Sequence, residues 1–528
     1  MTSAPADTLP DELPALRNAL GDLSQQNAAL ARQVAEYQAV IEKLKHELLL
    51  LRHWRFGARS EKFHNPDQGI LFPDEAAPPE VAVAEKPAAA TPRKGHGRNA
   101  VPATLPVERV EIAPAPEDRV CGPCGAEKIR IGEEIRRELD YIPGSVFVRE
   151  IVRPVFACPK ECEGQVVVAA PPPAPIEKGL PGPGLLAHVA VSKYHDHLPL
   201  HRQESIFPRA GVRLSRSTLA DWMDKAGHLL TTLHGEMKRR VLLSKVIHTD
   251  DTPVTVQDPK GKTKPHKGRL WIYHGDRFHP YVFYDFSPNR RQEWPLAILS
   301  GWKGYLQADA YQGYNALFGG GGLTEVACWA HARRKFVEAE KSDRRAREVI
   351  SLIGELYREE KHIKRVCERF GWSWSSPGTD GDRAEELRCR RRQRKSRPLL
   401  ERIHAWLRGP ACATVLPKSP LGEAVGYCRG NWEALCVFAG HGGLGIDNNA
   451  AENGLRPVAV GRKNYLFFGS DRGGHTGAVL YSVIQSAKRH GLDLWRYLRD
   501  VFKRLPTMTV SQVPELLPDR WRDSPADQ

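Results

Sequence analysis

The sequence predicts a multidomain protein that combines helical modules with an α/β domain, and three observations carry this prediction. A long heptad seam occupies the N-terminal region, two close cysteine pairs follow it, and strand-like runs later alternate with helix-like ones. A chain of 528 residues exceeds the size at which a single hydrophobic core keeps growing, so several domains are expected.

The first predicted element is a coiled coil. Steps of four and three residues connect Leu16 to Leu51 through mostly apolar positions, and the neighbouring positions are rich in Gln, Glu, Lys and Arg. A seam of this length predicts a leucine-zipper-like dimerisation helix over residues 13–56. Asn27 falls at a core position, where a buried Asn favours a parallel pair. The alternative is one amphipathic helix packed on its own domain, but the polar flanks favour the coiled coil.

A flexible linker and a metal-binding module are predicted next. Residues 64–104 are rich in Ala, Pro and Glu, which is typical of a linker. Residues 105–170 then hold two close cysteine pairs separated by two strand-like runs, a spacing typical of a tetrahedral Zn²⁺ site. Four thiolates leave no open coordination position, so the zinc is expected to be structural; four unrelated thiols are the alternative. The predicted ligands are Cys121, Cys124, Cys158 and Cys162.

Residues 178–240 are predicted to be helical. A short turn containing Gly211 separates two helix-like stretches, and Ser215 or Ser217 is placed to cap the second one. Two helices joined in this way suggest a helix-turn-helix-like DNA-binding domain, with Arg216 at the start of the reading helix. A plain helical linker domain is an equally good interpretation.

The period of the sequence changes to that of strands after residue 244. KVIHTDDTPVTVQD, GRLWIYHGD and HPYVFYDFS are three consecutive strand-like runs, and GYLQADA and TEVACWA follow in alternation with helix-like segments. This order predicts a mixed sheet with helices on its faces, as in an RNase H-like nuclease core. The core is expected over 244–340 and 441–505, with a helical insertion at 341–440 and a polar tail at 510–528.

Three acidic residues occupy positions suited to metal binding. Asp250 lies on the first strand, Asp309 ends the fourth, and Glu452 follows the helical insertion. Carboxylates are the ligands that Mg²⁺ prefers in proteins, and two metal ions held side by side cleave phosphodiesters. Asp251 competes with Asp250 for the first role. The sequence therefore predicts phosphodiester chemistry at these acids.

The charge balance favours a polyanionic partner. Lys and Arg number 77 against 63 Asp and Glu, a formal excess of 14, which suits double-stranded DNA. Arg456, Arg462 and Lys463 are candidate contacts to the DNA backbone, although each is also explicable as a surface charge. No secretion signal or membrane-spanning run is recognisable, so a cytoplasmic protein without a membrane partner is expected.

Several motifs resemble one known family. LRHWRFGARSEK, the four cysteines, SKYHDHLPLHRQESIFPRAGVRLSRSTLADW, HTDDTPV, GYLQADAYQGYNAL, CWAHARRKF and IDNNAAENGLRPVAVGRKNYLFFGSDRGG are similar to motifs of the large DDE-type transposases of the IS66 group of bacterial insertion sequences. One departure concerns HTDDTPV, where the family more often has Asp-Glu-Thr. Asp251 stands in the Glu position, and Asp250 matches the family's Asp.

The resemblance implies a function and a set of partners. A member of this family would bind insertion-sequence ends, cleave DNA and join the 3′ ends to a target. Asp250, Asp309 and Glu452 would be catalytic and would hold two Mg²⁺ or Mn²⁺ ions. A homodimer or higher homo-oligomer, accessory proteins encoded by the element and association with the bacterial nucleoid are also implied.

Two other interpretations of the chain, and the roles of two side chains, stay open. A stand-alone RNase H-like nuclease would share the core, and a DNA-binding regulator derived from a transposase would have a silent one. Asn448 is expected either to orient the third acid or to cap its helix. His331 is expected to be structural, although it is close enough in sequence to a core strand to approach the acids.

Overall fold

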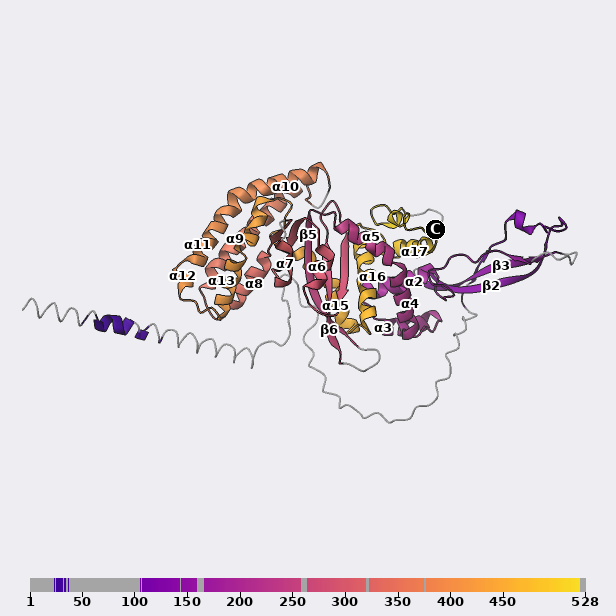
Figure 1. Cartoon of the computed structure of the whole chain (residues 1–528), viewed down its shortest axis with the longest axis horizontal. Coiled ribbons are helices and arrows are strands. Elements are labelled where there is room, and N and C mark those ends of the chain that lie inside the picture. Colours follow the sequence, from indigo (N-terminus) through magenta and orange to yellow (C-terminus); the bar gives the residue numbers. More distant parts are fainter. Residues whose placement is uncertain are drawn as a thin grey trace, which may run out of the picture. The chain divides into compact units, whose positions relative to one another are not determined.

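The computed structural model describes the chain in segments separated by gaps, and these segments fall into two compact units (Figure 1). One unit holds residues 334–351 and 405–427 with the N-terminal residues, and the other holds 97–333, 352–404 and 428–528. The described residues are 23, 25–31, 33–34, 37, 105, 107–142, 144–158, 166–257, 264–319, 322–374 and 377–522. Among them, no helix combines the length and the apolar character that crossing a bilayer requires.

The described part of the N-terminal seam is helical. Leu23, Leu30, Val34 and Tyr37 are assigned to helix, and all four side chains are exposed. The other seam positions and the predicted linker up to residue 104 lie outside the described residues.

The two cysteine pairs flank a long antiparallel hairpin. Strands β2 (Ile129–Ile142) and β3 (Ser145–Ala157) pair along their whole length, and Gly144 turns between them with φ of 93°. Strand β1 (Val107–Glu111) lies parallel to β3, and the short β4 (Val167–Val168) also pairs with β3. Because Ile129 faces Ala157 in the register, the chain before β2 and the chain after β3 meet at the same end of the hairpin.

Four helices follow the hairpin: α2 (Pro183–Tyr194), α3 (Leu200–Ile206), α4 (Arg216–Leu229) and α5 (Thr231–Val241). Ser215 caps α4 by accepting a hydrogen bond from the Thr218 N–H at 3.2 Å. Gly211 takes the left-handed conformation, with φ of 80°, in the turn before α4. The predicted turn and one of the two predicted caps are therefore present.

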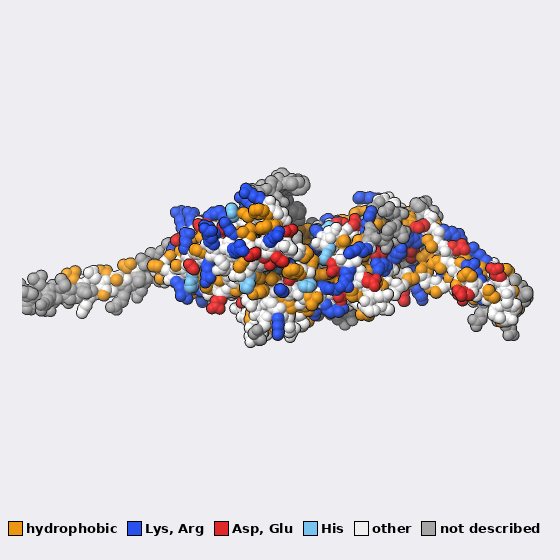
Figure 2. Space-filling view, turned by 90° about the horizontal axis from the view of Figure 1, so that it is seen from above, with side chains coloured by type: hydrophobic (Ala, Val, Ile, Leu, Met, Phe, Trp, Pro, Cys, Tyr) orange, Lys and Arg blue, Asp and Glu red, His pale blue; other side chains and the backbone are white. Residues whose placement is uncertain are grey.

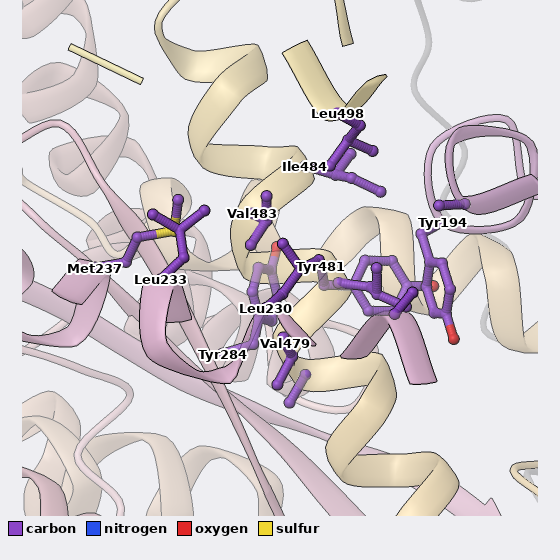
Figure 3. Packing of buried hydrophobic residues seen from close by; sticks show 14 of the residues in the cluster. Tyr194, Leu230, Leu233, Met237, Tyr284, Val479, Tyr481, Val483, Ile484 and Leu498 are labelled. Carbon is purple, nitrogen blue, oxygen red and sulfur yellow. The ribbon is translucent and has the colours of Figure 1, made fainter. Parts of the chain in front are cut away.

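These helices share a hydrophobic core with the sheet, which corrects the expectation of a separate domain at 178–240. Tyr194 of α2 and Leu233 and Met237 of α5 belong to the same buried cluster as Tyr284 of the sheet and Tyr481 of a later helix. Figure 3 shows these side chains converging around that helix. The apolar faces of α2, α4 and α5 are buried against it, so the segment has no core of its own.

The central sheet has five strands in the order β7-β6-β5-β8-β9. Strands β5 (Val246–Val256), β6 (His266–His274) and β7 (Val282–Ser287) form an antiparallel meander. Strands β8 (Gly304–Gln307) and β9 (Leu323–Val326) continue the sheet in parallel from β5. The short helices α6 (Glu293–Leu299) and α7 (Asn315–Phe318) occur between β7 and β9 in the chain.

Helix α16 (Asp471–Arg489) satisfies the open edge of this sheet at β7. The Ser482 hydroxyl accepts from the Tyr284 N–H at 2.8 Å, and the Ser486 hydroxyl accepts from the Val282 N–H at 3.0 Å and donates back to the Val282 carbonyl at 3.1 Å. An uncovered edge strand would expose a row of unpaired backbone groups. The two serines lie one helical turn apart and so match alternate residues of the strand.

The described part of the segment between β9 and the helix that carries Glu452 contains helices and loops but no strand. Its longest helix is α9 (Ala346–Arg369), and the helix that carries Glu452 is α15 (Asn449–Tyr465). The remaining helices of the segment are α8 (Trp329–Glu340), α10 (Thr379–Arg391), α11 (Arg397–Arg408), α12 (Pro410–Ala413), α13 (Pro420–Gly430) and α14 (Trp432–Cys436).

A buried arginine holds the end of this segment in place. Arg392 begins a π-helical stretch, Arg392–Ser396, and its side chain is fully buried. The guanidinium pairs with Glu360 at 2.7 Å and donates to the carbonyls of Phe438, His441 and Leu444 at 2.7–2.9 Å. These carbonyls belong to the loop that leads into α15, so Arg392 anchors the approach to Glu452.

The C-terminal region packs more closely than a tail. After helix α17 (Leu494–Arg504), the chain buries Val513, Leu516, Leu517 and Trp521 in the main cluster. The Trp521 indole donates to Asp500 at 2.8 Å. The prediction of a polar tail over 510–528 is therefore wrong for 513–521, because these widely spaced apolar residues meet α17.

Replacing Arg392 tests the anchoring role. The Arg392→Ala variant should lower the free energy of unfolding by about 3–5 kcal/mol, because it removes one partner of a buried ion pair and takes a donor from the carbonyls of His441 and Leu444. Arg390→Ala is the matched control, since the Arg390 side chain is 74% exposed and pairs only with Glu386 on the surface. Urea unfolding followed by tryptophan fluorescence compares the two; equal midpoints would contradict the role.

Candidate active site

The sheet brings Asp250 and Asp309 to the same level on neighbouring strands. In the parallel register of β5 and β8, His248 faces Gln307. Asp250 and Asp309 each lie two residues further along, and adjacent strands are about 4.8 Å apart. Just beyond β8, the Asp309 carboxylate accepts a hydrogen bond from the Tyr311 N–H at 3.1 Å, which fixes the turn that follows. The intervening Ala310 has a φ of 62°.

Helix α15 supplies the third acid from above the same face of the sheet. Glu452 lies in its first turn, and Gly454, two residues later, lies against the sheet. A Cβ at Gly454 would lie 2.2 Å from Cδ1 of Ile272, which is the β6 residue that pairs with Asp250. The Tyr284 hydroxyl donates to the Gly454 carbonyl from the same face. A larger residue here would require the Ile272 side chain to move, so the glycine allows the start of α15, which carries Glu452, to pack closely on β5 and β6.

Asn448 fastens the start of α15 to β5. Its side-chain amide donates to the Thr249 carbonyl at 2.8 Å, and its Oδ1 lies 3.2 Å from Nδ1 of His248. Asn448 is fully buried, and its side chain caps no backbone N–H of the helix. Of the two roles left open by the sequence, the geometry favours orienting the helix that carries the third acid.

The carboxylates influence one another electrostatically. Burial raises the pKa of Asp250 to about 7, and the negative charges of Asp309, Asp251 and Glu452 act in the same direction. The hydrogen bond that Asp250 accepts from the Asp251 N–H at 2.7 Å opposes this rise. A cation would relieve such a cluster, and carboxylate oxygens are the donors that Mg²⁺ and Mn²⁺ bind. The residues present therefore fit a divalent metal ion.

Asp251 has a different environment from its neighbour. Its carboxylate accepts from Arg290 at 2.8 Å and from Arg269 at 2.9 Å, and its side chain is 2% exposed. Burial raises the pKa of Asp251, and the two arginines oppose that rise. Because successive strand residues point to opposite faces, Asp251 lies on the face away from α15. Its oxygens are occupied by ion pairs.

The structure adds two side chains that the sequence did not single out. Arg290 connects the aspartates, since its guanidinium also lies 3.7 Å from Asp309 and stacks over the Tyr311 ring at 4.1 Å. Cys328 is buried beside the third acid, and its sulfur lies within 4.8 Å of ligand atoms of His331 and Glu452. The Arg-Arg pair after the third strand was the available signal for Arg290; a lone cysteine gave none for Cys328.

His331 lies next to Glu452 and not in a remote structural position. Its Nδ1 is 3.6 Å from Oε1 of Glu452. It extends from the first turn of α8, directly after β9. The expectation of a purely structural histidine therefore does not describe its surroundings.

The four predicted DNA contacts lie on two helices. Arg216 is exposed at the start of α4, while Arg456 and Lys463 are exposed on α15. Arg462 is half-buried, and its guanidinium donates to the Thr252 hydroxyl at 2.7 Å and to the Pro253 carbonyl at 2.6 Å. It therefore ties α15 to β5. Lys and Arg side chains are spread over the face in Figure 2, with Asp and Glu among them.

The cysteine module is separate from the acids. The ligand atoms of Cys121, Cys124 and Cys158 all lie within 4.8 Å of one another, with 3.5 Å between the sulfurs of Cys124 and Cys158. Cys162 lies outside the described residues. Three clustered sulfurs fit three of the four ligand positions of a tetrahedral thiolate site for Zn²⁺. Zn–S bonds of about 2.3 Å place the sulfurs of such a site roughly 3.8 Å apart.

Comparison with known sequences identifies the class of protein as a transposase. Four family profiles match, described as Transposase IS66 family over residues 178–476, Transposase C of IS166 homeodomain over 43–110, zinc-finger binding domain of transposase IS66 over 118–163, and IS66 C-terminal element over 482–518. The chain belongs to the IS66 family of transposases. The resemblance, the zinc finger and the leucine zipper predicted from the sequence are confirmed.

Three similar proteins come from Sinorhizobium fredii (strain NBRC 101917 / NGR234). Uncharacterized protein y4jD is 31% identical over 96% of this chain and 99% of its own length. Uncharacterized protein y4hP is 34% identical over 92% of this chain and 88% of its own length. Uncharacterized protein y4qI is 32% identical over 99% of both. The similarity therefore extends over the whole architecture.

The raised pKa of Asp250 predicts a pH-dependent stability. In metal-free protein its pKa of about 7 in the folded state exceeds the ordinary aspartate pKa of 3.8. The folded state therefore binds more protons between these two values, and stability falls as pH rises from about 4 to about 7. Asp250→Asn should therefore stabilise the metal-free protein at pH 8, and the gain should shrink as pH falls below 7. Thermal melting in EDTA from pH 5.5 to 8.5 measures it.

Metal ions should reverse the order of stability of the natural protein and the Asp250→Asn variant. Adding Mg²⁺ at pH 8 should raise the melting temperature of the natural protein and leave Asp250→Asn nearly unchanged, because the substitution removes a ligand oxygen charge. A gain for Asp250→Asn that did not depend on pH would contradict the electrostatic account.

The thiolate site predicts about one Zn²⁺ per chain. Cys121→Ser combined with Cys124→Ser should remove the metal, as measured by elemental analysis of the purified full chain. Cys412→Ser is the control, since Cys412 is buried and lies outside the module. Full zinc content in the double variant would refute the assignment.

Proposed function

We propose that this transposase cuts DNA at insertion-sequence ends and joins the freed 3′ ends to a target, using an RNase H-like core and two divalent metal ions. The observation that carries the proposal is the convergence of Asp250, Asp309 and Glu452 from two adjacent parallel strands and one helix. The strand order β7-β6-β5-β8-β9, with three antiparallel strands followed by two parallel ones, is the order predicted for that core and supports it.

The acids are proposed to hold the metal ions. Asp250 is central, because the charges of both other acids act on it, so it is the residue suited to contact both ions. When bound, Mg²⁺ or Mn²⁺ would stabilise the negative charge on the attacking and leaving oxygens at phosphorus. Arg290 would keep the Asp309 carboxylate in place, and Asn448 would hold the helix of Glu452 against β5.

The chemistry proposed is the same displacement performed twice. In the first, a water oxygen forms a bond to phosphorus, the bond to the 3′ oxygen breaks, and that oxygen leaves as a 3′ hydroxyl. In the second, the 3′ hydroxyl attacks a phosphodiester of the target DNA and displaces another 3′ oxygen. Both need the same arrangement of carboxylates, so one site suffices. The second displacement rests on membership of the family.

The transposase is proposed to act as a homodimer or a larger homo-oligomer. The exposed apolar side chains of Leu23, Leu30, Val34 and Tyr37 support this, since a/d residues of a coiled coil become buried only in a partner chain. A dimer would hold two DNA ends at once. Arg216 on α4 is proposed to contact the recognised end, and Arg456 and Lys463 the DNA backbone near the acids.

Substitution of each acid tests the proposal. Asp250→Asn, Asp309→Asn and Glu452→Gln should each reduce cleavage and joining by roughly a thousandfold or more with Mg²⁺ or Mn²⁺, because the two-metal arrangement fails when one ligand is lost. DNA affinity should stay within about threefold, since most of it comes from phosphate contacts elsewhere. The assay uses labelled duplexes that carry the two ends of the encoding element.

Asp251→Asn is the matched control. It should retain substantial cleavage, because the Asp251 carboxylate is bound to Arg269 and Arg290 and not directed at the other acids. The asparagine is preferred to alanine, since its oxygen can still accept from one arginine. An inactive Asp251→Asn with an active Asp250→Asn would exchange the roles of the neighbours, and full activity of Glu452→Gln would remove the third acid from the mechanism.

A further inference from the structure

Two large apolar side chains project into solvent directly after α15. Leu466 is 65% exposed and Phe467 is 41% exposed, although Phe468 beside them is only 4% exposed. Isolated exposed hydrophobic residues are common on protein surfaces. Two adjacent ones at the end of the helix that carries a catalytic acid require more explanation.

The backbone presents these side chains rigidly. Leu466 has φ of 65° and ψ of −40°, a conformation that costs a non-glycine residue free energy and that clusters at functional positions. Hydrogen bonds fix both sides: the Leu466 N–H donates to the Arg462 carbonyl at 2.9 Å, and the Phe468 N–H donates to the Thr255 carbonyl on β5 at 2.8 Å. The pair is thus held outward by the helix on one side and by the sheet on the other.

A stripe of exposed residues on α15 connects Glu452 to Leu466 and Phe467. Asn453, Arg456, Val460 and Lys463 are all exposed, and their spacing of three, four and three residues puts them on one face of α15, within about 80° of arc. Glu452 lies at the edge of that face. The stripe offers two positive charges and ends at Leu466 and Phe467.

We propose that Leu466 and Phe467 form an apolar wedge that inserts between base pairs of the bound DNA and bends it near the cleavage point. Leu466 lies fourteen positions after Glu452, so the wedge lies roughly 21 Å from the acid at 1.5 Å per residue. At about 3.4 Å per base pair, this corresponds to roughly six base pairs. Arg456 and Lys463 bind the phosphates in between.

The neighbouring charges select DNA as the occupant. The two charged residues on the exposed stripe, Arg456 and Lys463, are both basic. Their charge suits a phosphate backbone and not an acidic or neutral protein surface. Apolar side chains that enter a base step partially unstack it and bend the duplex. A rigid, outward-facing Leu-Phe pair meets that requirement, because a mobile loop would lose conformational entropy on insertion. The inference rests on the proposed function for the identity of the substrate.

Fluorescence of 2-aminopurine tests the wedge. Duplexes of the element ends carry the probe in turn at positions about four to eight base pairs from the cleavage point, and full-length protein is added in EDTA so that no strand is cut. One or two positions should brighten about threefold or more as the stack opens. The Leu466→Ala, Phe467→Ala double variant should lose this increase and bind within about tenfold of the natural affinity.

Two comparisons exclude a general surface effect. Leu243→Ala is the matched control, since Leu243 is 58% exposed and lies outside the stripe; it should keep the full signal. A second duplex carries two mismatched base pairs at the base step where the probe brightens. Cleavage of this duplex by the double variant should come within about threefold of cleavage by the natural protein, because the mismatches have already removed the cost of unstacking.

Contrary results are distinguishable from failure of the proposed function. An unchanged fluorescence increase in the double variant would overturn the wedge, and so would a loss of oligomer mass in light scattering without DNA, which would assign the pair to a second copy of the chain. Loss of brightening in the double variant together with no cleavage by the natural protein would keep the wedge and sink the catalytic proposal.

Discussion

The close contact of α15 with the central sheet is the constraint on which the site depends. Three anchoring contacts reach the strand partner of Asp250 or residues within two positions of it on β5: Gly454 meets Ile272, Asn448 binds the Thr249 carbonyl, and Arg462 binds Thr252. A larger residue at position 454 would meet the Ile272 methyl group at 2.2 Å, so either that side chain would have to move or the helix would shift away from β6 and carry Glu452 with it. The geometry of the acids therefore follows from packing more than from the acids themselves, whose mutual repulsion works against it.

Strand alternation gives the two adjacent aspartates opposite chemistry. Asp251 lies on the face that Arg269 and Arg290 reach, and its charge is balanced there by two ion pairs. Asp250 lies on the α15 face, where burial and then the neighbouring carboxylates raise its pKa, and the Asp251 N–H opposes that rise. A buried carboxylate without a compensating charge destabilises the folded state, and a divalent cation in the proposed site would supply that charge. The cationic partners of Asp251 also reach the site, because Arg290 lies 3.7 Å from Asp309.

Sequence reasoning located the acids but not the contacts that arrange them. The strand-like runs were distinct enough to predict where Asp250 and Asp309 lie along the chain, because β-branched and aromatic residues mark each strand. The same reasoning could not decide between Asp250 and Asp251, since only partner side chains distant in sequence distinguish them. It also assigned a separate domain to 178–240 and a tail to 510–528, because the partner surfaces of α2 and Trp521 are supplied by α16 and α17, hundreds or tens of residues away. Periodicity reports which face of an element is apolar and is silent about what covers it.

A long helical segment separates Asp309 from Glu452 in the chain, so contacts have to fix the position of Glu452. Arg392 makes such contacts. Between β9 and α15 the described chain passes through seven α-helices, α8 to α14, so the third acid cannot inherit its position from β9 by a short connection. The entropic cost of closing a connection rises only slowly with its length, but a long connection also leaves the position of the next element poorly fixed. Arg392 fixes that position, because its buried guanidinium binds Glu360 of α9 and the carbonyls of Phe438, His441 and Leu444 before α15. A hydrogen-bond donor that points five N–H groups in a fixed plane is well suited to this task, because each carbonyl it binds removes freedom from the loop. The last of these carbonyls belongs to Leu444, four residues before Asn448, which in turn binds β5. The path from the inserted helices to the acid therefore consists of consecutive buried polar contacts, and a substitution in it should displace Glu452 without altering any residue of the site.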